Sequence, residues 1–297
     1  MQKQATLRQH YVPQGFLRGF AAPNDQSRNL IWVYEKPAGR RPRKVSIRSI
    51  AWEPSYYAQE DKQGNPDLDT LEKAFATHID QPAAELIRDL RPRPAEVIEF
   101  SQDEKSLLAV FIAISLTRIP SFREPMLKFH SRMAQMELDR LAEQDPKVKE
   151  GVEKWGVTAE AKEWVTLTPM VMIAQQIAQS LLQKNWQFSV PEGDVQLVTS
   201  DNPVLISTGL QRDPFMGPAH PGTEIVINLR RDLALVCTPK QGYPTGMVFS
   251  QSREDTQKFN LGIVRAARRF VFASFHSPEM DMLVKKYASE HQTIKVD

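Results

Sequence analysis

The hydrophobic pattern of this chain changes near residue 185, and that change constrains the fold more than any other feature. Before it, apolar residues recur at helical spacing over long stretches. After it, short β-branched runs such as VQLVTS and LALVCT are separated by turns rich in proline and glycine. Helical and β-rich segments therefore occupy different parts of the chain instead of alternating regularly. This order predicts an α+β fold rather than a doubly wound parallel sheet.

The first part of the chain is expected to begin with a short helix and a β-hairpin. Pro13 can occupy the first turn of a helix that extends to Ala21, with its aromatic side chains on one face. Residues 29–36 and 45–50 are rich in β-branched and aromatic side chains and flank a polar loop. They predict the two strands of a hairpin.

Helices follow the hairpin. A helix is expected over residues 67–90, and Pro82 is expected to kink or divide it. Ser101 and Glu104 form a capping box, which predicts the start of an apolar helix that ends near Arg118. Helical spacing also covers residues 124–141 and 168–185, whereas the charged segment 142–166 is not assigned to one element.

The 297 residues are expected to form a single compact domain of two lobes, in which the N-terminal hairpin and helical part packs on the β-rich part. Residues 1–185 form the hairpin and the mainly helical lobe. Residues 186–297 form the β-rich lobe, with late helices at 254–268 and 278–289 on either side of the strand RFVFAS.

The charge balance predicts no chain-wide attraction for nucleic acids, because 38 basic and 36 acidic side chains give a net charge of only +2. Contact with a nucleic acid would need a local basic patch. One such patch is a candidate nucleic-acid-binding loop, and the alternative interpretation is a solvated loop tip. Its residues are Arg40, Arg41, Arg43 and Lys44.

The single cysteine, Cys237, excludes an intramolecular disulfide and any multi-cysteine zinc site. The first residues hold no apolar stretch of signal-peptide length. The most apolar run, residues 107–116, is too short to span a bilayer. We therefore expect a cytoplasmic protein without a membrane partner; the sequence gives no oligomeric state.

Two polar residues at the end of a β-run are candidates for a functional cleft. Asp201 and Asn202 lie in TSDNPV, where a turn follows the predicted strand. Such residues often bond only their own backbone, which is the structural alternative. In the functional interpretation, Asp201 binds a metal ion or orients a histidine, and Asn202 donates to an anionic oxygen.

Arg118 and Glu72 are the next candidates. Arg118 ends a helix that is apolar nearly all round, so its charge needs an acidic partner or a bound anion unless it reaches solvent. Glu72 and Asp201 are the expected partners. Glu72 shares a helix face with Asp69, and carboxylates on one face can bind a divalent cation; charges on the solvent face are the common alternative.

His10 stands three residues before Pro13, which places it at or just before a helix start. A histidine on such a turn can act as a general base or a metal ligand near neutral pH. The alternative is a hydrogen-bonded histidine with a structural role.

Four sequence blocks together resemble the bacterial family known as domain of unknown function 4238. They are RQHYVPQGFLRGF, LEKAF, TRIP and TSDNPV, in that order, and the resemblance covers nearly the whole chain. It implies no reaction. The motif positions it carries over are His10, Pro13, Glu72, Arg118, Asp201, Asn202 and Pro203, while Asp80 stands where a glutamate is expected.

These residues suggest a hydrolase. The sequence contains no Gly-x-x-x-x-Gly-Lys-Ser/Thr or Gly-x-Gly-x-x-Gly loop and no Gly-x-Ser-x-Gly elbow, so nothing supports the nucleotide-binding folds or the nucleophile elbow that these motifs mark. The leading hypothesis is a phosphodiesterase or nuclease that uses Mg²⁺ or Mn²⁺. Its metal ligands would be His10, Glu72 and Asp201, with Arg118 and Asn202 stabilising negative charge. The alternative is a non-catalytic module that binds nucleic acid or a small anionic ligand.

Overall fold

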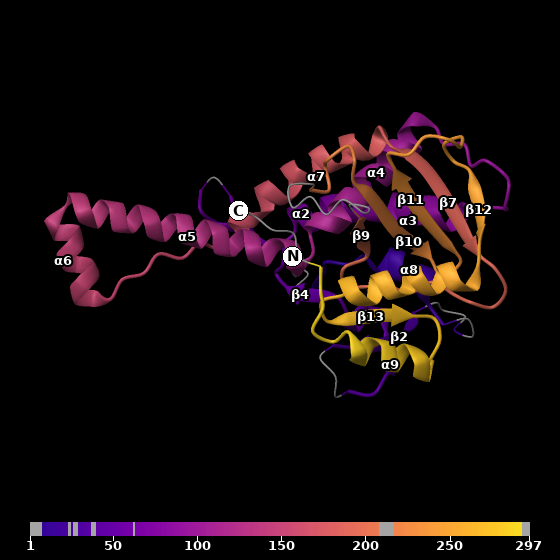
Figure 1. Cartoon of the computed structure of the whole chain (residues 1–297). Coiled ribbons are helices and arrows are strands. Elements are labelled where there is room, and N and C mark those ends of the chain that lie inside the picture. Colours follow the sequence, from indigo (N-terminus) through magenta and orange to yellow (C-terminus); the bar gives the residue numbers. More distant parts are fainter. Residues whose placement is uncertain are drawn as a thin grey trace, which may run out of the picture.

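The computed structural model describes residues 8–22, 25, 29–36, 40–61, 63–207 and 217–292. Helices and strands occur in the predicted order, and the fold is α+β (Figure 1). Two larger sheets and two short strand pairs form the β structure. The short pairs are β1 (Arg8–His10) with β4 (Trp52–Pro54), and β5 (Gln59–Glu60) with β6 (Pro66–Asp67).

The larger sheet has five strands and is built from the second part of the chain. Its strand order is β12-β7-β11-β10-β9, and only the β12–β7 pair is parallel. Nearly every residue of the neighbouring strands β10 and β11 is buried, so both faces of these strands are covered. Cys237 lies buried on β11, as expected. The strands are β7 (Asn185–Pro191), β9 (Val204–Ser207), β10 (Glu224–Arg230), β11 (Leu233–Thr238) and β12 (Val248–Gln251).

The second sheet joins the two ends of the chain. The predicted hairpin forms as β2 (Leu30–Glu35) and β3 (Arg43–Ser46). Its second strand ends earlier than predicted, because residues 47–49 form the turn η2. Strand β2 also pairs with β13 (Phe270–Ala273), which pairs in turn with β8 (Thr199–Ser200). The hairpin is therefore part of a sheet with C-terminal strands, and the division at residue 185 does not separate two sheets. The main hydrophobic cluster also contains side chains from both parts, from Tyr11 to Phe272.

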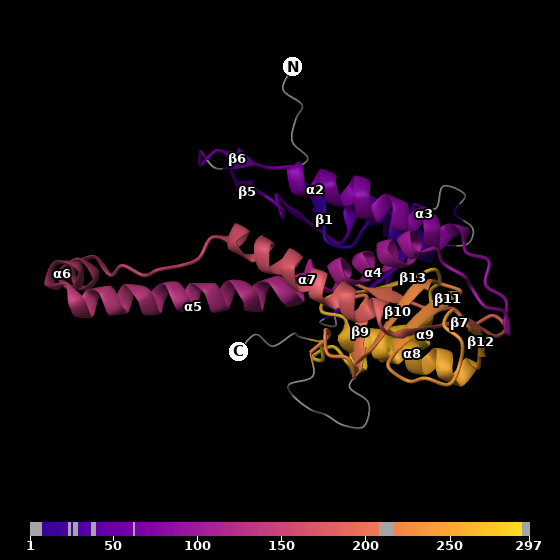
Figure 2. The same cartoon turned by 90° about the horizontal axis from the view of Figure 1, so that it is seen from above.

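Helices α4 (Gln102–Thr117) and α7 (Leu167–Leu182) pack beside the five-stranded sheet (Figures 1 and 2). Helix α4 starts at the predicted capping box of Ser101 and Glu104 and is buried along most of its length. Helix α7 packs on α4 through its buried apolar face. Helices α8 (Arg253–Ala266) and α9 (Pro278–Lys286) are the two predicted late helices.

The stretch Glu163–Leu182 is long and apolar enough to cross a membrane by length and composition, and 39% of its apolar window is buried. The bent pair α4 and α5 passes the same test as a unit. Core helices pass this test as well, so the finding is weak evidence for a span.

An arm extends from the body. Helix α5 (Pro120–Gln144) runs outward, α6 (Pro146–Trp155) turns back at its tip, and the chain returns to η4 (Glu163–Thr166) and α7 (Figures 1 and 2). The segment 142–166, left unassigned from the sequence, thus contains α6 and η4.

The N-terminal segment and the helix predicted over residues 67–90 define the region of the candidate site. The N-terminal segment contains α1 (Gln14–Leu17) and η1 (Arg18–Phe20), followed later by η2 (Ile47–Ser49). The predicted helix consists of α2 (Thr70–Phe75), a π-helical turn η3 (Ala76–Asp80) and α3 (Gln81–Asp89).

The helix continues through Pro82, so the proline does not divide it. Pro82 lacks an N–H and lies in the first turn of α3, directly after a π-helical turn in which the Gln81 N–H bonds the Ala76 carbonyl. The wider turn accommodates the proline while the helix continues. π-Turns of this kind are frequent at functional sites.

Candidate functional site

A cavity of about 1230 Å³ lies between the N-terminal segment, the α2–α3 helix and the β10–β11 turn. One face of α3 lines it through Gln81, Ala84, Glu85 and Arg88, which recur at helical spacing. Nine residues of helix make α3 about 13 Å long. The cavity therefore has two ends: residues around the start of α3 form one, and residues around the end of α3 form the other.

Glu72 is a half-buried carboxyl that lines the cavity before α3 begins. Burial and the nearby Asp80 carboxylate raise its pKa from 4.5 to about 7, against the opposing effects of Arg118 and of the backbone N–H of His10. A carboxyl with this pKa exchanges a proton near neutral pH. Glu72 thus has the properties of a general acid or base.

Arg118 lies behind this end of the cavity and is completely buried. Its two terminal nitrogens bind both carboxylate oxygens of Asp80, at 3.0 and 2.9 Å. The expected buried ion pair is therefore present, but its acid is Asp80 instead of Glu72 or Asp201. The π-turn ends at Asp80, and its geometry places this carboxylate against the arginine.

His10 lies at the end of β1 and lines the same end of the cavity. Its Nε2 is buried and makes no hydrogen bond, while its Nδ1 lies 3.5 Å from Gln14 Nε2. Burial lowers the pKa of His10 from 6.5 to about 4, the Arg48 carbonyl partly opposes this shift, and the charge of Arg8 adds to it. The imidazole is neutral at pH 7, and its backbone carbonyl accepts a hydrogen bond from the Tyr57 hydroxyl.

The low pKa of His10 predicts a pH-dependent contribution to stability. Because the folded pKa of about 4 lies below the ordinary value of 6.5, His10 contributes stability that is present above pH 6.5 and lost as the pH falls to 4. His10→Gln should reduce the acid-induced loss of unfolding free energy over this range by about 1–3 kcal/mol. Chemical denaturation at pH 7, 5.5 and 4 measures the effect.

The matched control is His78→Gln, which removes an exposed imidazole from η3. An equal pH dependence in wild type and His10→Gln would show that His10 makes no such contribution.

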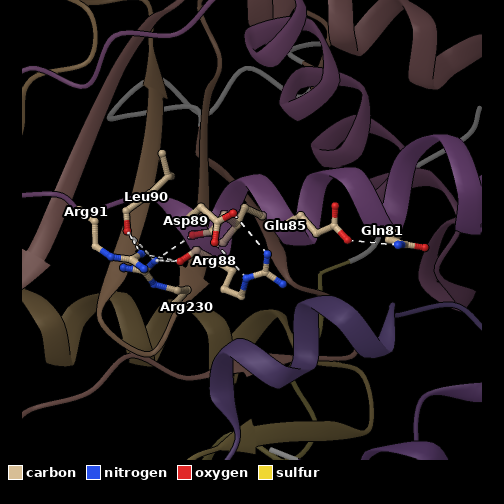
Figure 3. Close-up of polar contacts among 8 residues, drawn as sticks. Gln81, Glu85, Arg88, Asp89, Leu90, Arg91 and Arg230 are labelled. Carbon is tan, nitrogen blue, oxygen red and sulfur yellow. Dashed lines mark hydrogen bonds and ion pairs between the residues drawn. The ribbon is translucent and has the colours of Figure 1, made fainter.

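Arginines line the other end of the cavity (Figure 3). Arg230 donates to the carbonyls of Ile87 and Leu90 at 2.8 and 3.1 Å, and Arg91 donates to those of Arg88 and Leu90 at 2.7 and 2.9 Å. These bonds satisfy the carbonyl groups at the end of α3. The six arginines that line the cavity are Arg18, Arg88, Arg91, Arg93, Arg230 and Arg231.

Some of these cations already have carboxylate partners and others do not. Arg88 pairs with Asp89, and Arg230 pairs with Asp232 at 2.7 Å. Among the residues that the structure describes, no carboxylate pairs with Arg18 or Arg231, and Arg231 Nη1 donates only to the Ala21 carbonyl. This end of the cavity was not predicted from the sequence, although RPRP after a helix and the Arg-Arg-Asp turn were visible signals.

Asp201 and Asn202 are placed away from the cavity, which corrects the expectation that they share a cleft with His10. Asp201 is buried, and its carboxylate accepts bonds from the backbone N–H groups of Arg268, Arg269 and Phe270 at 2.7–3.0 Å. Asn202 donates to backbone carbonyls of residues 266 and 292. Asp201 therefore fixes the backbone between α8 and β13, and Asn202 joins the end of α8 to the segment that follows α9.

The predicted basic loop also lies outside the cavity lining. Arg40 and Arg43 pair with Glu35 at 3.5 and 2.9 Å, and Arg269 pairs with the same carboxylate at 3.0 Å. Although burial alone would raise the pKa of Glu35, the hydrogen bonds from Arg43 and Arg269 hold it below its ordinary value. Arg41 and Lys44 remain exposed.

The expected metal ligands His10, Glu72 and Asp201 do not come together. In the described part of the chain, no three histidine, cysteine, aspartate or glutamate side chains form a group that could hold a metal ion. Glu72 and Asp80 both line the cavity before α3 begins, and Asp80 is engaged by Arg118.

The fold and the cavity define an α+β protein with a large polar pocket that carries both carboxylates and arginines. The family model described as "Protein of unknown function (DUF4238)" matches residues 8–277, so the chain belongs to this family, as the sequence motifs predicted. No curated protein and no solved structure matches the chain. The family description names no reaction, and function is therefore argued from the cavity.

Proposed function

We propose that this protein is a hydrolase that cleaves phosphodiesters in the large cavity. The observation that carries the proposal is the arrangement of its lining: the half-buried Glu72 at one end and the arginines at the other, separated by the length of α3.

Glu72 is the acid–base group in this proposal. In its ionised form it accepts a proton from a water molecule as the water oxygen bonds to phosphorus; the ester P–O bond breaks, and the leaving oxygen takes a proton from solvent. His10 supports the reaction by position, since its backbone N–H favours the ionised form of the Glu72 carboxyl and lowers its pKa. This differs from the prediction made from the sequence, in which the His10 imidazole was the base.

The arginines select an anionic substrate. Guanidinium groups bind phosphate through charge-assisted hydrogen bonds. The end of α3, where Arg91 and Arg230 bind, lies about 13 Å along the helix from its start. In this proposal the arginines therefore bind another phosphate of the same molecule. A short oligonucleotide carries phosphates at regular intervals, so one phosphate can lie at the arginines while a diester further along the same strand lies at Glu72.

The divalent cation expected from the sequence is part of the test. No step of the proposal passes through a metal ion. The purified chain is incubated with short single-stranded RNA and DNA oligonucleotides and with bis(p-nitrophenyl) phosphate, in Mg²⁺, in Mn²⁺ and in EDTA. Product release in any of these conditions supports the proposal. Oligonucleotide binding without product in all of them would replace it with the non-catalytic binding module.

Arg18 lines the cavity and is expected to help bind an oligonucleotide. Arg18→Gln removes one guanidinium at the arginine end and should lower kcat/KM for an oligonucleotide about 10- to 100-fold, because a hydrogen bond to a charged group contributes about 1.5–3 kcal/mol. Hydrolysis of bis(p-nitrophenyl) phosphate, which has no second phosphate, should be unchanged. Steady-state kinetics on both substrates measure the difference.

Arg253→Gln is the control, because Arg253 is exposed, pairs with Asp194 and does not line this cavity. Equal losses on both substrates for Arg18→Gln would contradict a role in binding a second phosphate.

A further inference from the structure

Helix α5 is anchored to the body only at its start. Its buried residues lie in its first turns, and every later residue is half-buried or exposed. With 25 residues the helix is about 37 Å long, so most of it lies in the arm (Figures 1 and 2). Among the described residues, eight of the thirteen exposed large apolar side chains lie between Met133 and Met172. The arm region is therefore unusually apolar for a surface.

Four apolar residues of α5 recur with coiled-coil spacing. Met126, Phe129, Met133 and Met136 are separated by three, four and three residues, as in the a and d positions of a heptad. Met126 is buried at the base of the arm, whereas Met133 and Met136 are 51% and 59% exposed. We call these four residues the arm seam.

The rest of the arm does not cover this seam. The chain that returns from α6 bonds the side chains of Ser131 and Gln135: Ala159 N donates to Gln135 Oε1 at 2.9 Å and Ala161 N to Ser131 Oγ at 3.1 Å. On a helix with 3.6 residues per turn, these two residues lie on the side opposite Met133. The arm therefore packs on itself through one face of α5 and leaves the other face apolar and uncovered.

Charged residues flank the seam in a self-complementary order. In the same heptad, Arg132 and Asp139 occupy g positions, and His130 and Glu137 occupy e positions. When two such helices run antiparallel about a two-fold axis, Arg132 of each copy faces Asp139 of the other. His130 of each copy likewise faces Glu137 of the other. Each flanking side chain is therefore paired with one of opposite charge or with a hydrogen-bonding partner.

Arg140 distinguishes the antiparallel pair from the parallel one. Arg140 occupies the next a position of the seam. In a parallel pair, the two Arg140 side chains would meet, and their charges would repel each other. In an antiparallel pair with Met133 against Met136 of the second copy, Arg140 lies against Phe129, where a cation–π contact is favourable.

We propose that the arm seam binds the arm seam of a second copy of this chain, as an antiparallel two-fold helix pair. The exposed methionines form the apolar centre, and the flanking charges set the direction. The cavity of each copy lies in its body, so this assembly does not depend on the proposed hydrolase function.

Sedimentation equilibrium of the full chain tests the proposal. Wild type should be dimeric at about 50 µM, a concentration at which a micromolar dissociation constant favours the dimer. The double variant Met133→Glu/Met136→Glu should be monomeric. Because both side chains are exposed, its circular dichroism should match wild type, as should its thermal midpoint when both proteins are diluted below the dissociation constant. Met282→Glu is the matched control, since Met282 is an exposed methionine on α9, away from the arm.

Charge exchange tests the direction of the pair. Arg132→Glu should weaken the dimer about tenfold or more, since it places two acidic groups opposite each other, and adding Asp139→Arg in the same chain should restore it. A parallel pair, in which Arg132 would face Glu137, would not be restored by Asp139→Arg. A monomeric wild type, a dimer that survives Met133→Glu/Met136→Glu, or a failure of Asp139→Arg to restore the dimer would overturn the proposal.

Discussion

Arg118→Met is expected to lower the free energy of unfolding by about 3–5 kcal/mol, the usual effect of removing one partner of a buried ion pair. Arg118 is completely buried and binds both oxygens of Asp80, whose side chain is only 18% exposed. Methionine fills much of the same volume but leaves the Asp80 carboxylate without its counter-charge. Urea denaturation at pH 7 gives the free energy of unfolding from the midpoint and slope.

A double-mutant cycle isolates the pair from the loss of packing. Asp80→Asn leaves the Arg118 charge buried, and it should destabilise the fold as well. Because both single variants break the same interaction, Arg118→Met/Asp80→Asn should lose less stability than the sum of the two. Arg88→Met provides the control at an exposed arginine–aspartate pair and should change stability little. Additive losses in the cycle would show that the two side chains are energetically independent.

Local chemistry made much of the fold predictable. The Ser101–Glu104 capping box fixes the start of α4, and the apolar character of that helix all round agrees with its burial. The hairpin was predicted because β-branched and aromatic residues on both sides of a polar loop favour strands. These features depend on residues close together in the sequence.

Long-range pairing was not predictable in the same way. Strand β2 pairs with β13, which lies near the other end of the chain, and β13 also pairs with the two-residue strand β8. The sequences of β8 and β13 contain no pattern from which their partner strands could be predicted. The hairpin was consequently assigned to the helical lobe, although its sheet includes C-terminal strands.

The candidate site shows the same limit. Burial of Arg118 and its need for an acid followed from the apolar helix before it, but the choice of Asp80 depends on the π-turn that accommodates Pro82. Asp201 was a candidate site residue because it follows a predicted strand within the TSDNPV motif. In the fold, however, its carboxylate oxygens accept hydrogen bonds from the backbone N–H groups of residues 268–270. The sequence identifies polar residues that need a partner when they are buried. Which partner each of them contacts depends on the tertiary fold.

Glu72→Gln should lower kcat for phosphodiester hydrolysis about 10²- to 10⁴-fold, the range that a positioned general base contributes. Glutamine keeps the size of the side chain and cannot accept the proton. Since only ionised Glu72 accepts it, and its pKa is about 7, wild-type activity should rise with pH and reach half its maximum near pH 7. The variant's residual activity should lack this dependence.

The same substitution should stabilise the fold at alkaline pH, which separates loss of activity from loss of structure. Because the folded pKa of about 7 lies above the ordinary value of 4.5, the contribution of Glu72 to stability is complete below pH 4.5 and is lost as the pH rises through 7. Glu72→Gln lacks this loss. The free energy of unfolding of the variant minus that of wild type should therefore be about 1–3 kcal/mol larger at pH 8.5 than at pH 4.5.

Asp69→Asn is the matched control, because Asp69 lies one turn earlier, pairs with Lys73 and does not line the cavity. It should retain wild-type activity. A Glu72→Gln protein that is as active as wild type would contradict the acid–base role of Glu72. A Glu72→Gln protein that is inactive and more stable than wild type at pH 8.5 would support the proposal. It would show that the ionised carboxylate destabilises the fold and is retained for the reaction.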